Sequence, residues 1–177
     1  MRRLSIGLLI ALLTFVIGAT AVLWLIPRLA PETALEQPAP DGWIQNEFWG
    51  YSFFIPPGMS SRNIQGTDGW IREYQNADML VHMEYGITGD LNFNLFQAKQ
   101  PEFKEEEVII NGQKAKWCTY RLGDSEADTF GDRERRYVVE MYFTEPRDRS
   151  RPIFSATCKS PAEQEIAKQI FRTVKVK

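Results

Sequence analysis

Histidine and cysteine are scarce in this chain of 177 residues, which contains one histidine and two cysteines. So few soft ligands exclude a zinc site built from several Cys and His side chains, and they also exclude a disulfide-rich scaffold. The sequence has no phosphate-binding glycine loop, no Gly-x-Ser-x-Gly motif and no His-Glu-x-x-His motif. No catalytic residue, metal site or cofactor is therefore predicted, and the sequence favours a protein that is not an enzyme.

A surplus of positive charge is also missing. The chain has 21 Lys and Arg against 23 Asp and Glu, and the first 40 residues hold three of the bases and two of the acids. The remainder therefore has 18 bases against 21 acids, a net charge of −3. This balance argues against a nucleic-acid partner, because binding to phosphates needs a clear excess of Lys and Arg.

The N-terminal segment Ser5 to Ile26 contains 22 residues and no charge. At about 1.5 Å per residue a helix of this length spans about 33 Å, enough to cross a bilayer. Arg2 and Arg3 precede it, which predicts a cytoplasmic N-terminus and an extracytoplasmic C-terminal part. The segment predicts a single-pass protein of the bacterial inner (cytoplasmic) membrane. A cleaved signal peptide ending at the small residues Ala19 and Ala21 is the alternative.

Three regions follow from these patterns. Residues 1–26 are the predicted membrane anchor, and residues 27–41, with four prolines, are a predicted linker. Residues 42–177 are the predicted extracytoplasmic domain, which is long enough for one hydrophobic core.

Alternation of apolar and polar residues predicts several strands in this domain. They are Tyr51–Ile55, Trp70–Gln75, Met79–Tyr85, Tyr137–Phe143 and Ile153–Cys158. Asn111-Gly112 is the dipeptide that a two-residue type I′ turn favours, so it predicts a hairpin in which Ile110 opposes Gln113 and Glu107 opposes Lys116. The acidic residues of Gly123 to Asp132 are expected in a loop. Their spacing resembles that of a calcium-binding loop only loosely, because the glycine and the terminal glutamate that such a loop requires are absent.

Helical periodicity appears in two places. Ser160-Pro161-Ala162-Glu163 combines an N-cap, a proline at the first helical position and a capping-box glutamate, and it predicts a helix from Pro161 to Arg172. A short strand, Thr173 to Val176, should follow. A weaker helix is predicted around Leu91, Leu95 and Phe96. The expected fold class is α+β, with a single transmembrane helix followed by a domain that has a central antiparallel sheet and flanking helices.

The order of these elements resembles the PsbP-like fold family. The resemblance covers Phe48 to Val176 and rests on the opening run Phe48 to Gly58, on the Asn111-Gly112 hairpin and on the closing helix with Ile166, Ile170 and Phe171. It implies a central antiparallel sheet with helices on both sides, and proteins that mostly bind or help to assemble larger complexes. It implies no catalytic residues.

The two cysteines, Cys118 and Cys158, both fall on predicted strands. Outside the cytoplasm a disulfide between them can persist, and the sequence favours that bond. Two small buried thiols are the alternative.

Candidate interface residues are the aromatic and arginine side chains that are enriched at protein contacts. They are Trp43, Phe48, Trp49, Arg133, Arg135 and Arg136. The alternatives are that the aromatic residues close the core and that the arginines, interleaved with Asp132 and Glu134, form a solvated edge.

These observations together predict a membrane-anchored, extracytoplasmic, non-catalytic binding or assembly module, such as an accessory subunit of a larger membrane complex. Its expected partners are the membrane, through residues 5–26, and a protein. The alternatives are a secreted protein with a cleaved signal peptide and an extracytoplasmic hydrolase based on carboxylates. The hydrolase requires a pocket with two carboxylates of opposed pKa.

Overall fold

The fold was analysed in a computed structural model that describes residues 38–65, 69–86, 96–130, 133–144 and 152–177. All of them belong to one unit, Ala34–Lys177. The predicted anchor, residues 1–26, and most of the predicted linker, residues 27–41, lie outside the described residues, so both stay predictions. Within the described part of the chain, no helix has the length and apolar character needed to cross a membrane.

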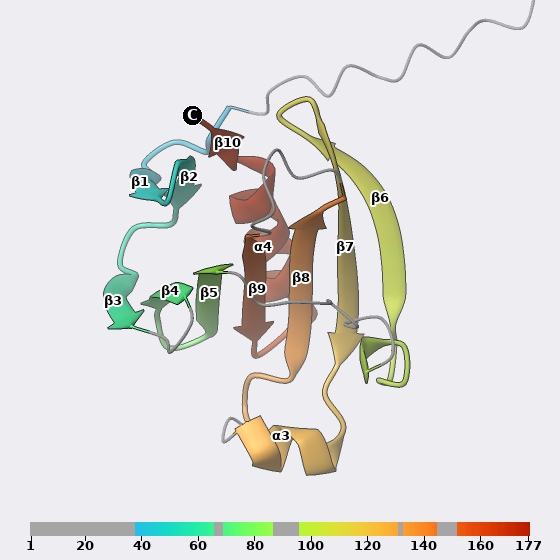
Figure 1. Cartoon of the computed structure of the whole chain (residues 1–177). Helices are drawn as coiled ribbons and strands as arrows, with labels where there is room; N and C mark the ends of the chain where they lie inside the picture. The colour runs from blue at the N-terminus through green and yellow to red at the C-terminus, as the bar shows by residue number, and fades with distance from the viewer. Residues whose placement is uncertain (1–37, 66–68, 87–95, 131–132, 145–151) are drawn as a thin grey trace, which may run out of the picture. The chain divides into compact units, whose positions relative to one another are not determined.

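Seven strands form one antiparallel sheet in the order β3-β4-β5-β9-β8-β7-β6 (Figure 1). Their bounds are β3 Ser60–Gln65, β4 Gly69–Gln75, β5 Met79–Gly86, β6 Lys104–Ile110, β7 Gln113–Arg121, β8 Tyr137–Phe143 and β9 Ile153–Cys158. The predicted Asn111-Gly112 hairpin is confirmed, because Ile110 opposes Gln113 and Glu107 opposes Lys116. The other predicted strands are confirmed to within one residue at each end, except the last one, which was expected over Thr173 to Val176 and contains only Lys175–Val176.

A smaller antiparallel sheet has the order β1-β2-β10, formed by Ile44–Phe48, Tyr51–Ile55 and Lys175–Val176. β1 and β2 form a hairpin in which Phe48 opposes Tyr51, so its turn contains only Trp49 and Gly50. The last strand, β10, pairs with β2, and the backbone N–H of Lys177 donates to the Gly50 carbonyl at 2.8 Å. The C-terminal end of the chain therefore holds the first hairpin in place.

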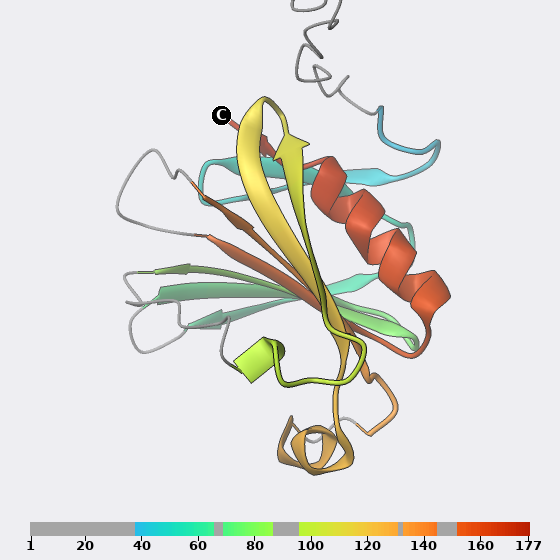
Figure 2. The ribbon, with the colours of Figure 1, turned by 90° about the vertical axis from the view of Figure 1, so that its right-hand side faces the viewer.

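The predicted C-terminal helix is confirmed as α4, Pro161–Arg172. The Ser160 hydroxyl accepts from the Ala162 backbone N–H at 3.2 Å, and Pro161 begins the helix where no N–H donor is needed. Ala167, Ile170 and Phe171 form its buried face. Figure 2 shows α4 lying along one face of the large sheet, and it contacts β8, β9 and β2.

The main hydrophobic core lies between that face, the small sheet and α4. Its fully buried side chains include Phe53, Val81, Met83, Val139, Met141, Phe154, Ile170 and Phe171. A second, smaller cluster lies where β7, β8 and the helix α3 (Asp124–Phe130) meet and consists of Cys118, Tyr120, Leu122, Ala127 and Val138, with Phe103 packed against it. Burying a large apolar side chain stabilises a fold by about 1.5–3 kcal/mol, so the main core is the principal source of stability.

The predicted fold class is wrong. The described chain is mostly β and forms two sheets, and α3, Asp124–Phe130, and α4 are its two helices with assigned bounds. α3 lies beyond the ends of β7 and β8 (Figure 1), so of these two helices only α4 covers a face of the large sheet. The error arose because β1 (IQNEF) is a short, exposed strand with little apolar alternation, which hid the second sheet. β3 (SSRNIQ) lacks that alternation too, which hid the end strand of the large sheet.

The structure also differs from the predicted acidic loop and describes only part of the weaker predicted helix. The expected acidic loop from Gly123 is mostly the helix α3, in which Asp124 and Glu126 occupy the first turn, where negative charge favours a helix. The weaker helix prediction falls largely outside the described residues. Of the segment that was expected to end before Pro101, residues 96–100 are described. Phe96 and Gln97 are helical, and Ala98 to Gln100 form a turn.

Candidate functional site

The turn of the first hairpin places a large aromatic residue in an unfavourable backbone conformation. Trp49 has φ +46° and Gly50 has φ +77°, whereas Asn111 and Gly112, in the other two-residue turn, have φ +48° and +73°. This geometry favours Asn at the first position, and a side chain as large as Trp costs about 1–2 kcal/mol there. Trp49 is also 47% exposed, so it occupies a strained position without being fully buried.

Trp49 belongs to a cluster of three aromatic rings, here called the aromatic platform: Trp49, Trp70 and Tyr85. Trp70 and Tyr85 oppose each other on β4 and β5. The Trp49 ring stacks on Tyr85 with centroids 5.2 Å apart and lies 5.3 Å from Trp70 at an angle of 38°. Rings this close leave no room for a ligand between them, so the platform is not a cage for a quaternary ammonium group. Its free surface faces outward, and Trp70 is 50% exposed.

Arg72 on β4 fixes the position of the hairpin. Its Nη1 donates to the Glu47 carbonyl at 2.8 Å, its Nε donates to Asn63 Oδ1 at 2.6 Å, and its guanidinium lies 5.7 Å from the centre of the Phe48 ring. Lys177 Nζ forms an ion pair with Glu47 at 2.5 Å. The hairpin tip is thus held by both sheets, which makes the surface around Trp49 preorganised.

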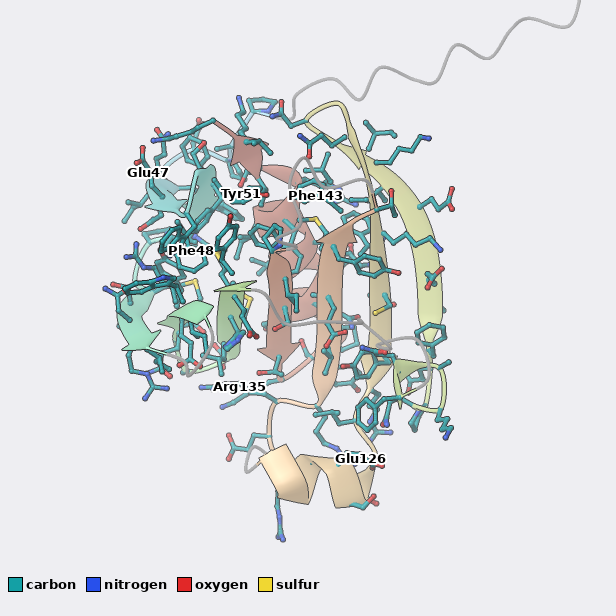
Figure 3. The ribbon with its side chains drawn as sticks, in the orientation of Figure 1. Glu47, Phe48, Tyr51, Glu126, Arg135 and Phe143 are labelled. Atoms are coloured by element: carbon teal, nitrogen blue, oxygen red, sulfur yellow. The ribbon has the colours of Figure 1, made fainter. Side chains whose placement is uncertain are left out.

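A pocket of about 450 Å³ lies between the hairpin tip and the strands β3 and β4. Its volume is within the range of small-ligand sites. Figure 3 shows Glu47 and Phe48 on the side of the molecule where β1 faces β3 and β4. Three of the lining side chains are polar, those of Glu47, Asn63 and Arg72. The others are aromatic or aliphatic: Phe48, Trp49, Ile64, Trp70 and Ile71. Such a pocket accommodates an apolar or aromatic group and offers hydrogen-bonding partners at its rim.

The predicted interface residues do not form one surface. Phe48 and Trp49 line the pocket, but Phe48 is only 6% exposed and belongs to the main core. Trp43 is partly buried and packs against the same core. For Phe48 and Trp43 the structure therefore shows the alternative, aromatic residues that close the core.

The three predicted interface arginines lie toward α3, at the opposite end of β4 and β5 from the aromatic platform. Arg135 Nη2 donates to the Asn76 carbonyl at 3.0 Å (Figure 3). Arg136 Nη2 donates to the Leu122 carbonyl at 3.1 Å and forms an ion pair with Asp124. Arg133 is exposed. Arg135 and Arg136 thus bind backbone carbonyls of the neighbouring connections.

A continuous row of polar residues crosses the face of the large sheet opposite α4. The strand registers place seven residues side by side, one on each strand: Arg62, Glu73, His82, Ser155, Glu140, Cys118 and Glu105. Two of its carboxylates are largely removed from water. The hydrolase that the sequence left open would need such carboxylates as its acid and its base.

Glu140 has neutral donors and no cation among its hydrogen-bond partners in the described residues. Its carboxylate accepts from Gln97 Nε2 at 2.9 Å, from the Tyr120 hydroxyl at 3.0 Å and from the Cys118 thiol at 3.7 Å. Burial raises the pKa of Glu140, and these three hydrogen bonds reduce the increase. Gln97 Oε1 is buried without a hydrogen-bond partner in the described structure, so the cluster leaves one acceptor unsatisfied.

Glu73 has the opposite environment. Arg62 Nε donates to its Oε2 at 3.1 Å, and His82 Nδ1 lies 3.3 Å from its Oε1. Burial alone would raise the pKa of Glu73, but the hydrogen bonds and positive charge of Arg62 and His82 outweigh it and lower the pKa. Glu73 and Glu140 are separated by three strand steps of about 4.8 Å, or about 14 Å between their α-carbons. Acid and base pairs of glycosidases have carboxyl groups about 5–9.5 Å apart with the substrate between them. Here His82 and Ser155 lie between the two glutamates, and each carboxylate binds its own partners, so they do not form such a pair.

The predicted disulfide is contradicted, because both cysteines are free and buried. Cys118 lies two strand steps from Ser155 on β9, and Cys158 is three residues beyond Ser155. The offset of three residues places the thiols on opposite faces of the sheet, and the α-carbon separation is about 14 Å against a limit of about 7 Å for a disulfide. Burial raises the pKa of both thiols, that of Cys158 to about 12.

Within the described ranges, no group of three or more His, Cys, Asp or Glu side chains is arranged to hold a metal ion.

Trp70, Tyr85, Arg72 and Asn63 were missed as site residues by sequence reasoning. One signal was available in the sequence. Trp49-Gly50 lies between the short segments Ile44–Phe48 and Tyr51–Ile55, and a two-residue turn at such a place favours Asn-Gly. The partners of Trp49 could not be inferred, because they depend on how the small sheet packs against β4 and β5.

No protein-family model matches this sequence, and no curated protein matches it. Among solved structures, the chain is similar to LpqN of Mycobacterium tuberculosis, a protein involved in cell envelope biogenesis, with 12% identity and a TM-score of 0.34 over 78% of this chain and 80% of LpqN. A TM-score this low transfers neither fold nor function, and the PsbP-like resemblance stays a prediction.

Proposed function

We propose that this protein is a non-catalytic binding module that recognises a partner protein through the pocket beside Trp49. The observation that carries the proposal is the strained, half-exposed Trp49 at a turn that favours Asn. Unfavourable backbone conformations cluster at functional sites, where the surrounding structure compensates for their cost. The contacts of Trp49 with Trp70 and Tyr85 supply that compensation.

The composition of the pocket favours a protein as the ligand. Trp, Tyr and Arg are the residues most enriched at the energetic centres of protein interfaces, and Trp49, Trp70 and Arg72 meet here. The polar side chains of Glu47 and Asn63 surround the apolar centre, as in interfaces that combine an apolar core with a polar rim.

In this proposal the domain acts outside the cytoplasm, in the cell envelope, as an assembly module or an accessory subunit of a membrane complex. The charge-free segment Ser5 to Ile26 behind Arg2 and Arg3 supports export of residues 42–177. A periplasmic reporter such as alkaline phosphatase fused to Lys177 should be active, and an inactive fusion with an active cytoplasmic reporter would disprove this location.

Site-specific photo-crosslinking tests the binding function. A photoreactive phenylalanine analogue is placed at Trp70 in the full-length protein, expressed in its native cells, and the crosslinked products are identified by mass spectrometry. The matched control carries the analogue at Phe96, an aromatic residue that lies outside the pocket and has 43% of its surface exposed. We expect one defined protein crosslinked at Trp70 and not at Phe96.

A second variant separates specific from accidental capture. Trp49→Asn keeps a residue suited to the turn and removes the platform ring, so it should abolish the Trp70 crosslink while the protein remains folded. Identical products at Trp70 and Phe96, or a Trp70 product that persists in Trp49→Asn, would contradict the proposal.

A further inference from the structure

We propose that the partner contributes an extended peptide segment that pairs with the free edge of β3 and inserts one apolar or aromatic side chain into the pocket. This inference rests on the proposed function and specifies the form in which the partner binds. Three observations support it. One edge of β3 has no strand partner in the described structure, β3 carries only one charged residue, and β3 forms part of the pocket wall.

β3 is the end strand of the large sheet and pairs with β4 alone among the described strands. The N–H and C=O groups on its other side therefore have no strand partner in the described structure. Ser60, Ser61, Arg62 and Asn63 are exposed along this edge. An unpaired row of backbone donors and acceptors is a template for another extended chain.

The other end strand of the same sheet, β6, is protected by charge against pairing with further strands. β6 begins with four consecutive charged residues, Lys104 to Glu107, and charge on an end strand opposes pairing with further strands. β3 carries a single charge, Arg62, whose guanidinium forms an ion pair with Glu73 within the sheet face. The sheet thus has one edge protected by charge and one edge that is not.

β3 also forms part of the pocket wall. Asn63 and Ile64 line the pocket together with Trp49, Trp70 and Arg72. A peptide paired with β3 runs about 4.8 Å from it and directs alternate side chains to the same face, about 7 Å apart. One of these side chains then faces the aromatic platform. Backbone pairing supplies affinity and the pocket supplies sequence preference, which is the usual division of roles in strand addition.

The test uses the purified full-length chain in a mild detergent and a phage-displayed library of random dodecapeptides as the probe. The tightest peptide is synthesised with a fluorophore, and its Kd is measured by fluorescence anisotropy. The Kd is then measured for a series of peptides in which each backbone amide in turn is N-methylated. N-methylation removes one donor, so strand pairing predicts that every second methylation weakens binding about tenfold while the intervening ones have little effect.

Three variants of the protein locate the peptide. Ser61→Lys adds a charge to the β3 edge at a residue whose side chain makes no hydrogen bond in the described structure, and we expect at least about tenfold weaker binding. Gln45→Lys adds the same charge to β1, the end strand of the small sheet, and should leave the Kd unchanged. Trp49→Asn should weaken binding at least about tenfold through the pocket.

The outcomes distinguish this inference from the proposed function. A peptide that needs Trp49 but shows no alternation on N-methylation and no effect of Ser61→Lys overturns the strand addition and leaves the pocket as a binding site. If Gln45→Lys weakens peptide binding and Ser61→Lys does not, the peptide binds at β1, and strand addition at β3 is also overturned. If the library yields no peptide that depends on Trp49, strand addition is excluded, whereas the crosslink at Trp70 still decides the proposed function.

Discussion

The Trp49 ring stacks on Tyr85 with ring planes within 4° of parallel and centroids 5.2 Å apart. Trp49 belongs to the turn of the small sheet and Tyr85 to β5 of the large sheet, so this contact joins the two sheets at the rim of the pocket. The same ring therefore serves two purposes that can be measured separately: it contacts the large sheet, and it presents an exposed apolar surface.

The first prediction separates these purposes with Trp49→Asn. The substitution relieves a backbone strain of about 1–2 kcal/mol, and it removes two aromatic contacts of about 0.5–1.5 kcal/mol each. These two effects nearly cancel, but the apolar burial of the half-exposed ring is also lost, so we expect the free energy of unfolding to fall by about 1–3 kcal/mol. Urea denaturation of the full-length protein measures it.

Phe53→Ala provides the reference for a structural aromatic residue. Phe53 is fully buried, and truncating such a ring costs about 3–5 kcal/mol. A loss of that size in Trp49→Asn would mean that Trp49 is retained for stability and would weaken the binding proposal.

The sequence predicted elements whose signal is local. Asn111-Gly112 determines its own hairpin register, and Ser160 and Pro161 define the start of α4 from residues adjacent in the chain. β3 carried no such signal, because a half-exposed strand with one pairing partner needs no apolar alternation.

The site could not be predicted to the same extent, because it depends on long-range packing. Glu73 and Glu140 become members of one row only through the registers of four strands, β4, β5, β9 and β8. Cys118 and Cys158 fall on opposite faces because of the registers that join β7, β8 and β9. Likewise Trp49 meets Trp70 only after the small sheet packs on the large one.

The second prediction concerns the thiols. Cys158 is fully buried and its pKa is raised to about 12, and Cys118 is 5% exposed with a pKa raised by burial and by Glu140. We expect neither to react with a thiol reagent at pH 8 in the folded protein, and two to react after denaturation. Cys118→Ser and Cys158→Ser should each lose one reactive thiol. A linked peptide pair in non-reducing mass spectrometry would show instead that a disulfide forms.

The third prediction is that Glu73→Gln destabilises the protein in a pH-dependent way. The pKa of Glu73 is lowered on folding, so its contribution to stability is present above its unfolded pKa and disappears as the pH falls through the folded pKa. We expect a loss of about 1 kcal/mol at pH 7, kept small because the Arg62 side chain is 63% exposed, and a smaller loss at pH 3. Glu84→Gln, whose carboxylate is 3.7 Å from His82, is the matched control and should change stability less. Equal losses at both pH values would exclude the charge of Glu73 as the cause.

The fourth prediction has the opposite sign and concerns Glu140. The pKa of this carboxyl is raised on folding because it is buried, so its contribution is most favourable below the unfolded pKa and is lost as the pH rises through the folded pKa. Glu140→Gln removes the buried charge, and rotation of the Gln97 amide lets its unpartnered Oε1 accept from the new amide. We therefore expect Glu140→Gln to stabilise the protein by about 1 kcal/mol at pH 7 and to leave its stability nearly unchanged at pH 3.

The control for this effect is Tyr120→Phe, which removes the hydroxyl that donates to Glu140 Oε1 and should destabilise the protein more at pH 7 than at pH 3. Urea denaturation of the full-length protein at both pH values measures all three chains. If Glu140→Gln instead lowers stability at pH 7, the hydrogen bonds from Gln97, Tyr120 and Cys118 stabilise the carboxylate by more than its burial costs. That result would identify Glu140 as a structural anion and would reverse the pH dependence derived from its burial.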